Sequence, residues 1–270
     1  MTRNTIGVFD SGFGGLTVLR ALLPLFPGSH FLYLGDTARL PYGAKSQATI
    51  ARYAVESARF LEDKGCQRLV IACNTATALA LPDIRDNVGV PVTGVILPGA
   101  QAARAAATGE DILVLATDAT VSSHAYRDNA ASLGLRAHEK ACPLLVPLVE
   151  EGWIEHPVLY DVLRIYLREA LHEMAEQGRV PSAVLLGCTH YPLIADPIRR
   201  VLRELDCPAT VVDSAEATAA EVAAAAGPQS SLHAATFECF ATDSVQKFAR
   251  LGSLFLQRPI HSVNLLDLGG

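Results

Sequence analysis

Apolar, strand-like runs alternate with longer amphipathic stretches along most of this 270-residue chain, and this alternation constrains the fold more than any other feature. Seven runs stand out: IGVFD, HFLYLGD, RLVIACN, VPVTGVI, DILVLAT, AVLLGCT and ATVVDSA. Helical segments such as QATIARYAVESARFLEDKG lie between them. Continuous apolar strands that alternate with helices indicate parallel sheets with helices on both faces. The sequence therefore predicts an α/β protein with mainly parallel sheets flanked by helices.

The length of the chain corresponds to roughly two domains, or to one large α/β unit. Two segments, RLVIACNTAT and AVLLGCTHYP, resemble each other: each places a small residue, a cysteine and hydrogen-bonding side chains at the end of a strand. We interpret the likeness as two related α/β halves that face each other across a cleft, and chance is the alternative. The first predicted domain comprises residues 1–97 and 210–270, and the second comprises residues 98–209.

Ligands of parallel α/β sheets bind at the carboxyl ends of the strands. Polar residues follow the predicted strands at these positions: Asp10 and Ser11, Asp36, Cys73 and Asn74, Thr117, Cys188 and Thr189, and Asp213. This pattern predicts that the functional site lies at these strand ends.

The segment TIGVFDSGFGG joins a predicted strand to a helix that begins near Leu16. Its glycine spacing fits neither the dinucleotide fingerprint nor a P-loop, and no lysine lies near it. What remains is the carboxylate of Asp10 in a loop otherwise suited to anions. That combination suits a ligand with a cationic and an anionic group. Alternatively, Asp10 and Ser11 only cap the helix.

Composition and charge exclude several classes of function. The net charge of −6 and the scattered basic residues argue against binding to nucleic acid or to an anionic membrane. The N-terminal MTRNTIGV has no signal-peptide pattern, and no apolar run reaches the length of a bilayer span. We therefore expect a cytoplasmic protein.

The six cysteines contain no C-x-x-C pair, and the chain has no H-E-x-x-H motif, so no metal site is predicted. Four cysteines, Cys66, Cys142, Cys207 and Cys239, are expected to be small buried hydrophobic residues. Cys73 and Cys188 differ because each lies at a loop entrance beside polar donors. One activated cysteine with His190 would indicate acyl transfer. Two thiols in equivalent positions instead indicate a racemase or epimerase that uses two bases.

Four motifs, taken in order, closely resemble the signatures of glutamate racemases in the aspartate/glutamate racemase superfamily. They are DSGFGG (10–15), GDTARLPYG (35–43), ACNTAT (72–77) and LGCTHYPL (186–193). The resemblance extends through ATDATVSSHAY (116–126), PLVEEG (147–152) and VVDSA (211–215), and so covers roughly residues 6–215. The last forty residues carry no usable motif.

The resemblance implies a cofactor-independent enzyme that interconverts L- and D-glutamate and supplies D-glutamate for peptidoglycan in the bacterial cytoplasm. It implies that Cys73 acts on D-glutamate and Cys188 on L-glutamate, each as acid or base. Asp10 and Ser11 are then expected to bind the substrate, with Asp10 near the ammonium and near Cys73. Donors to the carboxylates are expected from Tyr42 and Gly43, Asn74 and Thr75, and Thr189 and His190, with Thr117 and Thr120 as further candidates. A homodimer is a further expectation from the family.

Several of these roles have a structural alternative. His190 is expected to favour the Cys188 thiolate, with Glu150 orienting it, but His190 and Glu150, like Asp36, are also compatible with structural roles. Arg39 is either part of the site or a surface charge. The only lysines, Lys45, Lys64, Lys140 and Lys247, occupy no recognisable cofactor motif, so no pyridoxal Schiff base is expected.

Three other functions compete with the racemisation of glutamate. Aspartate and hydantoin racemases share the two-thiol plan. A Cys-His hydrolase would use Cys188 and His190 and would not need Cys73. A protein that only binds acidic amino acids would need neither thiol.

Overall fold

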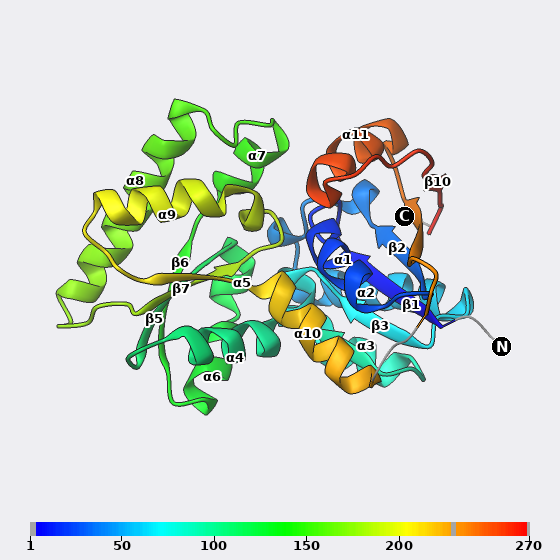
Figure 1. Cartoon of the computed structure of the whole chain (residues 1–270), viewed down its shortest axis with the longest axis horizontal. Helices are drawn as coiled ribbons and strands as arrows, with labels where there is room; N and C mark the ends of the chain where they lie inside the picture. Colours follow the sequence, from blue (N-terminus) through cyan, green and yellow to red (C-terminus); the bar gives the residue numbers. More distant parts are fainter. Residues whose placement is uncertain (1–3, 228–230, 269–270) are drawn as a thin grey trace. The chain divides into compact units, whose positions relative to one another are not determined.

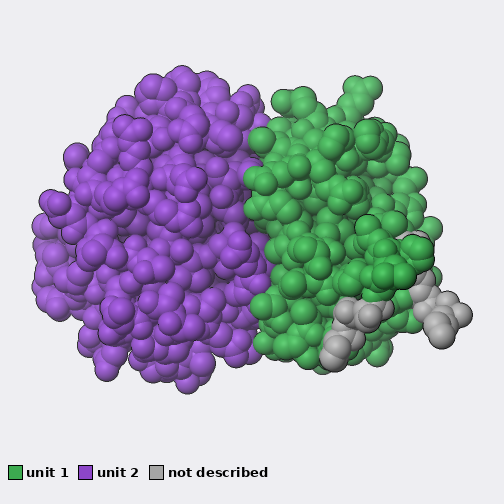
Figure 2. Space-filling model, in the orientation of Figure 1, with its two compact units in different colours: residues 1–95, 218–270 green, residues 96–217 purple. Residues whose placement is uncertain are grey.

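The computed structural model describes residues 4–227 and 231–268, which form two compact units (Figure 2). Unit 1 is built from the described parts of residues 1–95 and 218–270, and unit 2 from residues 96–217. The chain passes from unit 1 into unit 2 at the start of helix α4 (Ile96–Ala106) and returns within helix α10 (Ser214–Ala226). The predicted domain borders, after residues 97 and 209, and the predicted cleft between two domains stay predictions.

Unit 1 contains a six-stranded sheet in the order β10-β9-β2-β1-β3-β4 (Figure 1). Every neighbouring pair in it is parallel. The strands are β1 (Thr5–Asp10), β2 (His30–Gly35), β3 (Arg68–Ile71), β4 (Val92–Gly94), β9 (Thr236–Ala241) and β10 (Asn264–Leu265). Asp10 pairs with Gly35 and Gly35 pairs with Ala241, so the ends of three strands lie side by side.

Helices cover both faces of this sheet because successive side chains of a strand point to opposite sides. Leu32 and Leu34 of β2 belong to one core with residues of α2 and α3, whereas the Tyr33 ring lies 5.9 Å from the Phe248 ring of α11. The helices of unit 1 are α1 (Leu16–Leu22), α2 (Gln47–Asp63), α3 (Asn74–Asn87) and α11 (Val245–Leu256), with the 3-10 turns η1 (Leu23–Leu25), η2 (Thr37–Arg39) and η3 (Tyr42–Ala44).

Unit 2 contains a four-stranded parallel sheet in the order β6-β5-β7-β8. Figure 1 shows α4 and α6 on one side of it and α8 and α9 on the other. The strands are β5 (Asp111–Ala116), β6 (Arg136–Ala141), β7 (Ala183–Gly187) and β8 (Thr210–Asp213). The remaining helices are α5 (Asp118–Ser122), α6 (Ala125–Ser132), α7 (Leu145–Glu150), α8 (Pro157–Ala175) and α9 (Ala195–Glu204), with the 3-10 turn η4 (Tyr191–Ile194). Among the described helices, none is both long enough and apolar enough to cross a bilayer.

The two sheets repeat one strand order. In chain order, the first four strands of unit 1 lie as second, first, third, fourth, and the four strands of unit 2 lie in the same sequence. Cys73 and Cys188 each follow the third strand of their unit, β3 and β7. The predicted α/β class with similar parallel sheets flanked by helices is confirmed.

All seven predicted strand runs contain strands, and three further strands appear. β6 has the polar sequence RAHEKA because it lies at the edge of its sheet, where it is partly exposed. β9 and β10 extend the sheet of unit 1 from the C-terminal part of the chain. The segment SAEATAAEVAAAAGPQ predicts a helix that ends at Gly227 and Pro228. This helix is α10, and Gly227 follows it with a φ of 75°. Pro228 lies outside the described residues.

All six cysteines are buried and free, as expected for small hydrophobic residues or thiols in a site. Burial raises the pKa of Cys66 to about 11 and those of Cys142 and Cys239 to about 12. These three thiols therefore stay protonated near neutral pH.

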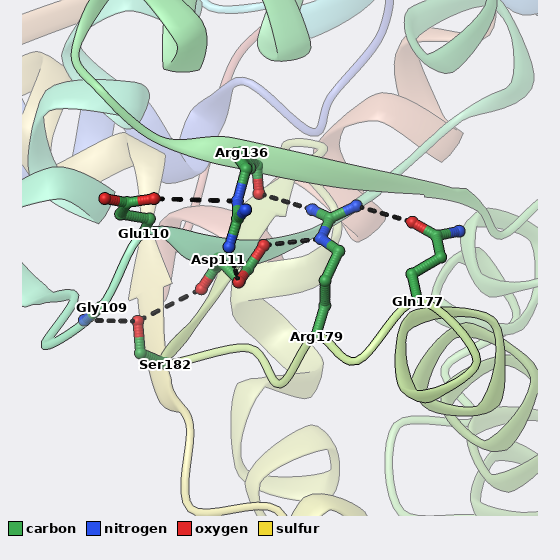
Figure 3. A network of polar contacts seen from close by, with 7 residues as sticks. All are labelled: Gly109, Glu110, Asp111, Arg136, Gln177, Arg179 and Ser182. Atoms are coloured by element: carbon green, nitrogen blue, oxygen red, sulfur yellow. Dashed lines mark hydrogen bonds and ion pairs between the residues drawn. The ribbon is translucent and has the colours of Figure 1, made fainter.

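A charged cluster holds the amino end of β5, at the opposite end of the strand from Thr117 (Figure 3). The Asp111 carboxylate accepts hydrogen bonds from Arg179 Nε at 2.6 Å and from Arg136 at 2.7 Å. Arg179 also donates to the Arg136 carbonyl at 2.9 Å, and Ser182 Oγ donates to the Asp111 carbonyl at 3.2 Å. Although burial acts in the other direction, the two guanidinium groups lower the pKa of Asp111.

Replacing Asp111 by asparagine is expected to destabilise the protein by about 2 kcal/mol, because the two arginines lose their charged acceptor. The lowered pKa means that this stability is present above the ordinary pKa of an aspartate and is lost as the pH falls through the pKa in the folded state. Urea unfolding of both proteins at neutral and acidic pH measures the difference. The control is Asp128→Asn, which removes an exposed pair with Arg127 and is expected to cost much less. Equal losses in the two variants would contradict the prediction.

Candidate active site

The loop after β1 is held by its own backbone and by close packing. Gly12 N–H donates to Asp10 Oδ2 at 2.9 Å, and Asp10 is buried. A Cβ at Gly15 would lie 2.6 Å from Asp10 Cβ and 2.8 Å from Ala72 Cβ, so only glycine fits there. Helix α1 begins at Leu16, with Gly15 as its N-cap and no side-chain cap. The alternative that Asp10 or Ser11 caps this helix is therefore wrong.

Two residues of β2, Tyr33 and Gly35, support the same loop, and neither was predicted as part of the site. The Tyr33 hydroxyl donates to the Gly12 carbonyl at 3.0 Å. A Cβ at Gly35 would overlap the same carbonyl oxygen and would lie 2.7 Å from Phe248 Cε2. The motif GDTARLPYG contains Gly35, but its contact with Gly12 depends on the pairing of β1 with β2, which no local pattern reveals.

Cys73 is the N-cap of α3 and lies beside this loop. Its Sγ donates to Ser11 Oγ at 3.4 Å and accepts from Ala76 N–H at 3.4 Å. Burial and then the charge of Asp10 raise the pKa of Cys73 to about 12, despite its hydrogen bonds with Ser11 and Ala76, which act in the other direction. In the protein without substrate, Cys73 is therefore a thiol and a potential proton donor.

Asn74 and Thr75 are the first two residues of α3 and are almost fully buried. The N–H groups at the start of a helix have no partner within the helix and attract anions. Thr77, in the same turn, donates from its hydroxyl to the Ile71 carbonyl at 3.0 Å, which fixes the helix to the end of β3.

The segment 36–43 is organised around the buried carboxylate of Asp36. The Tyr42 hydroxyl donates to Asp36 Oδ2 at 2.6 Å, so any donor that this residue offers to a ligand is its main-chain N–H. Gly43 is exposed. Arg39 lies 3.7 Å from Asp36 Oδ1, donates to Glu56 at 2.7 Å and is buried, which rules out the alternative of a surface charge. Burial raises the pKa of Asp36, against the opposing effects of Tyr42, Arg39 and Thr242.

In unit 2, Cys188 follows β7 and lies close to His190. Cys188 Sγ is 3.9 Å from His190 Nδ1, and His190 Nε2 is 3.3 Å from Oε1 of Glu150, the last residue of α7. Burial lowers the pKa of His190, but Cys188 and Glu150 outweigh this effect and raise it to about 10. The imidazole is therefore protonated near neutral pH, and its positive charge lies next to Cys188 Sγ.

Three predicted threonines lie in unit 2. Thr189 Oγ1 is 3.4 Å from His190 Nδ1. Thr117 follows β5, and its hydroxyl is 3.0 Å from that of Thr120, which is fully buried. Thus unit 1 brings together Asp10, Ser11, Cys73, Asn74 and Thr75, and unit 2 brings together Glu150, Cys188, Thr189 and His190.

Comparison with known proteins gives a family for these two clusters. The model of the Asp/Glu/Hydantoin racemase family matches residues 7–222, which is most of the chain. The chain belongs to this racemase family. The match includes both cysteines and every predicted site residue.

Individual members agree with this result. A glutamate racemase of Koribacter versatilis is 49% identical, and the alignment covers 99% of each chain. The structure of glutamate racemase from Thermus thermophilus with β-chloro-D-alanine superposes with a TM-score of 0.85, at 41% identity and 98% coverage of each chain. The enzyme from Francisella tularensis with D-glutamate gives a TM-score of 0.87, at 29% identity and 99% coverage of each chain. The resemblance to glutamate racemases is confirmed, and the chain is an amino-acid racemase.

Proposed function

We propose that this protein interconverts L- and D-glutamate without a cofactor, using Cys73 and Cys188 as the two acid/base groups. One observation carries the proposal: the two thiols follow the third strands of two parallel sheets with the same strand order. The names of its relatives support glutamate as the substrate. The proposed role is to supply D-glutamate for peptidoglycan in the bacterial cytoplasm.

The proposed reaction moves one proton at each face of the α-carbon. With L-glutamate, the Cys188 thiolate removes the α-proton and the Cys73 thiol donates its proton to the opposite face. The product is D-glutamate, Cys188 is left as a thiol and Cys73 as a thiolate. With D-glutamate, the same steps run in reverse. Exchange with solvent resets the two thiols between turnovers.

The two sulfurs have different electrostatic surroundings. A protonated His190 lies next to Cys188, the proposed base for L-glutamate, whereas burial and Asp10 keep Cys73 protonated. We propose that Asp10 and Ser11 bind the substrate, with its ammonium near Asp10. The positive charge of the ammonium would offset the negative charge of Asp10. This would stabilise the thiolate at Cys73 when the reaction produces it.

The proposed carboxylate donors are mostly amide and hydroxyl groups. They are the main-chain N–H groups of Tyr42 and Gly43, the start of α3 at Asn74 and Thr75, and the side chains of Thr189 and His190, with Thr117 and Thr120 as further candidates. Donors to the α-carboxylate that are held in place before the substrate binds stabilise the charge that develops as the α-proton leaves. Donors to the side-chain carboxylate bind the substrate equally in the ground state and in the transition state.

The direct test is incubation of the purified, reduced protein with L-glutamate, D-glutamate, L-aspartate or D-aspartate, with no added cofactor, followed by circular dichroism. Loss of optical activity with both glutamate enantiomers is expected. Racemisation of aspartate alone would change the substrate, and no racemisation of either amino acid by the folded protein would contradict the proposal.

A Cys-His hydrolase is the second candidate, because the side chains of Cys188, His190 and Glu150 also have the arrangement of a nucleophile, a base and an orienting acid. This function would not require Cys73. The Cys73 variant described in the Discussion therefore separates the two candidates.

Replacing His190 by glutamine is expected to move the acidic limb of the pH profile of kcat/KM to higher pH. Glutamine carries no positive charge, so the thiolate at Cys188 loses its stabilising neighbour. The measurement is kcat/KM from about pH 6 to about pH 10 in both directions, a range that spans the titration of ordinary and perturbed histidines. His172→Gln, on the exposed face of α8, is the control and should leave the limb in place. An unchanged limb in His190→Gln would contradict the role of the charge.

The ionisation of His190 also gives stability a defined pH dependence. Its pKa in the folded protein is about 10, which lies above the ordinary value of about 6.5. The resulting stability is fully present below the ordinary pKa and is lost as the pH rises through the pKa of the folded state. The difference in the free energy of unfolding between the wild type and His190→Gln should therefore shrink as the pH rises from the ordinary pKa of about 6.5 to the pKa of about 10 in the folded protein.

A further inference from the structure

The turn after β9 carries Thr242 and Asp243, and it contacts the segment 36–43 of the proposed substrate site. β9 pairs with β2 so that Ala241 lies opposite Gly35, which brings the turn beside the start of this segment. The C-terminal part of the chain, which has no recognisable motif, therefore lies next to residues of the motif GDTARLPYG.

Reciprocal hydrogen bonds join the two segments. Thr242 Oγ1 donates to Asp36 Oδ1 at 2.9 Å and accepts from Ala38 N–H at 2.9 Å. Thr37 Oγ1 donates to the Asp243 carbonyl at 2.6 Å and accepts from Asp243 N–H at 2.9 Å. Each threonine hydroxyl is thus both a donor and an acceptor across the contact. The two hydrogen bonds fix the orientation of each hydroxyl group.

Asp36 passes this constraint on to Tyr42. Asp36 Oδ1 accepts the hydrogen bond from Thr242 Oγ1, and Asp36 Oδ2 accepts the hydrogen bond from the Tyr42 hydroxyl at 2.6 Å. Asp36 is fully buried, so its carboxylate cannot exchange these donors for water without local opening. The Tyr42 ring is also packed, with its centroid 6.4 Å from that of Phe9 and 6.2 Å from that of Tyr53.

We propose that Thr242 is a positioning residue of the racemase: through Asp36 it holds Tyr42, and thereby the main-chain N–H groups of Tyr42 and Gly43 that receive a substrate carboxylate. The inference rests on the proposed function for the role of these N–H groups. Thr242 itself does not touch the substrate, and its effect passes through the hydrogen bonds described above.

The proposal predicts a specific kinetic effect. A carboxylate contact away from the reacting hydrogen is made equally in the ground state and in the transition state, so its loss raises KM and leaves kcat nearly unchanged. The effect should be the same for L- and D-glutamate, because the same N–H groups serve both.

The test is Thr242→Val, which keeps the shape of the side chain but removes its donor and its acceptor. We expect KM to rise roughly fivefold to tenfold for both enantiomers, as for the loss of a hydrogen bond to a buried charged group, with kcat nearly unchanged. Thr242→Ser, which keeps the hydroxyl, should restore most of the wild-type KM. The matched control is Thr236→Val at the other end of β9, where Thr236 contacts His30 instead, and it should leave KM unchanged.

A double-mutant cycle with Tyr42→Phe tests the relay through Asp36. If Thr242 acts through Asp36 on Tyr42, the effects of the two substitutions on KM are not additive, and the double variant changes less than the product of the single effects. Additive effects would contradict the relay.

Amide hydrogen exchange of residues 36–43 gives a readout that does not depend on activity. Exchange should be faster in Thr242→Val than in the wild type and unchanged in Thr236→Val. Unchanged exchange, or an unchanged KM in an active Thr242→Val, would overturn the proposal. A wild type that does not racemise glutamate would instead overturn the proposed function, and exchange alone would then decide whether Thr242 positions this segment.

Discussion

Racemisation in both directions is expected to fall by roughly 10³-fold or more when Cys73 is replaced by serine, because the enzyme loses one of its two acid/base groups. A serine hydroxyl ionises far less readily than a thiol, so it cannot serve as the base for D-glutamate. The reaction from L-glutamate slows as well, since a serine hydroxyl is a weaker acid than a thiol and donates its proton to the opposite face of the α-carbon less readily. Circular dichroism with each enantiomer at saturating concentration measures the loss.

The control is Cys66→Ser, the same substitution of a buried thiol that precedes β3, whereas Cys73 follows it. It is expected to lower stability but to keep most of the activity per folded molecule. Cys188→Ser should match Cys73→Ser in both directions. A Cys73→Ser variant that keeps its turnover would contradict the two-base mechanism and favour the Cys-His hydrolase.

The second large effect is expected from Gly35→Ala, which should lower kcat/KM by roughly 10²-fold, as displacements of about 1 Å in a site do. The new methyl group would overlap the Gly12 carbonyl and would press on the ring of Phe248. Since the N–H of the same residue, Gly12, donates to the Asp10 carboxylate, a shift of Gly12 also displaces Asp10 and Ser11. Kinetics with both enantiomers and a thermal melt of the same sample separate the loss of activity from unfolding.

Gly89→Ala is the matched control, because its methyl group would meet only Glu62 Oε1, at an ordinary distance of 3.4 Å. Tyr33→Phe gives a second test without added volume, since it only removes the hydrogen bond to the Gly12 carbonyl. It should lower kcat/KM in the same direction by a smaller factor. Wild-type kinetics in both Gly35→Ala and Tyr33→Phe would contradict the importance of this loop geometry.

The sequence predicts most of the sheet-forming segments, because a strand buried on both faces has a continuous apolar run. It does not predict β6, whose polar residues lie at a sheet edge, or β9, whose sequence TFECFA is half-exposed at its start. Local patterns reveal burial, whereas the place of a partly exposed strand depends on pairing with distant segments.

The two cysteines and His190 could be predicted because they follow strands within recognisable motifs. The supporting residues could not. Tyr33 and Gly35 act through a neighbouring strand, and Thr242 lies 206 residues after Asp36 along the chain. The role of the Tyr42 hydroxyl also required the structure, which shows that it binds Asp36.

The most direct test of the two-base mechanism is racemisation in D₂O, followed by proton NMR and circular dichroism during the first part of the reaction. Thiol protons exchange with solvent, so the product of either enantiomer should carry deuterium at Cα while the remaining substrate keeps its proton. Deuterium that enters the remaining substrate as fast as the product, or a product that retains the original α-proton, would contradict the assignment of one thiol to each face.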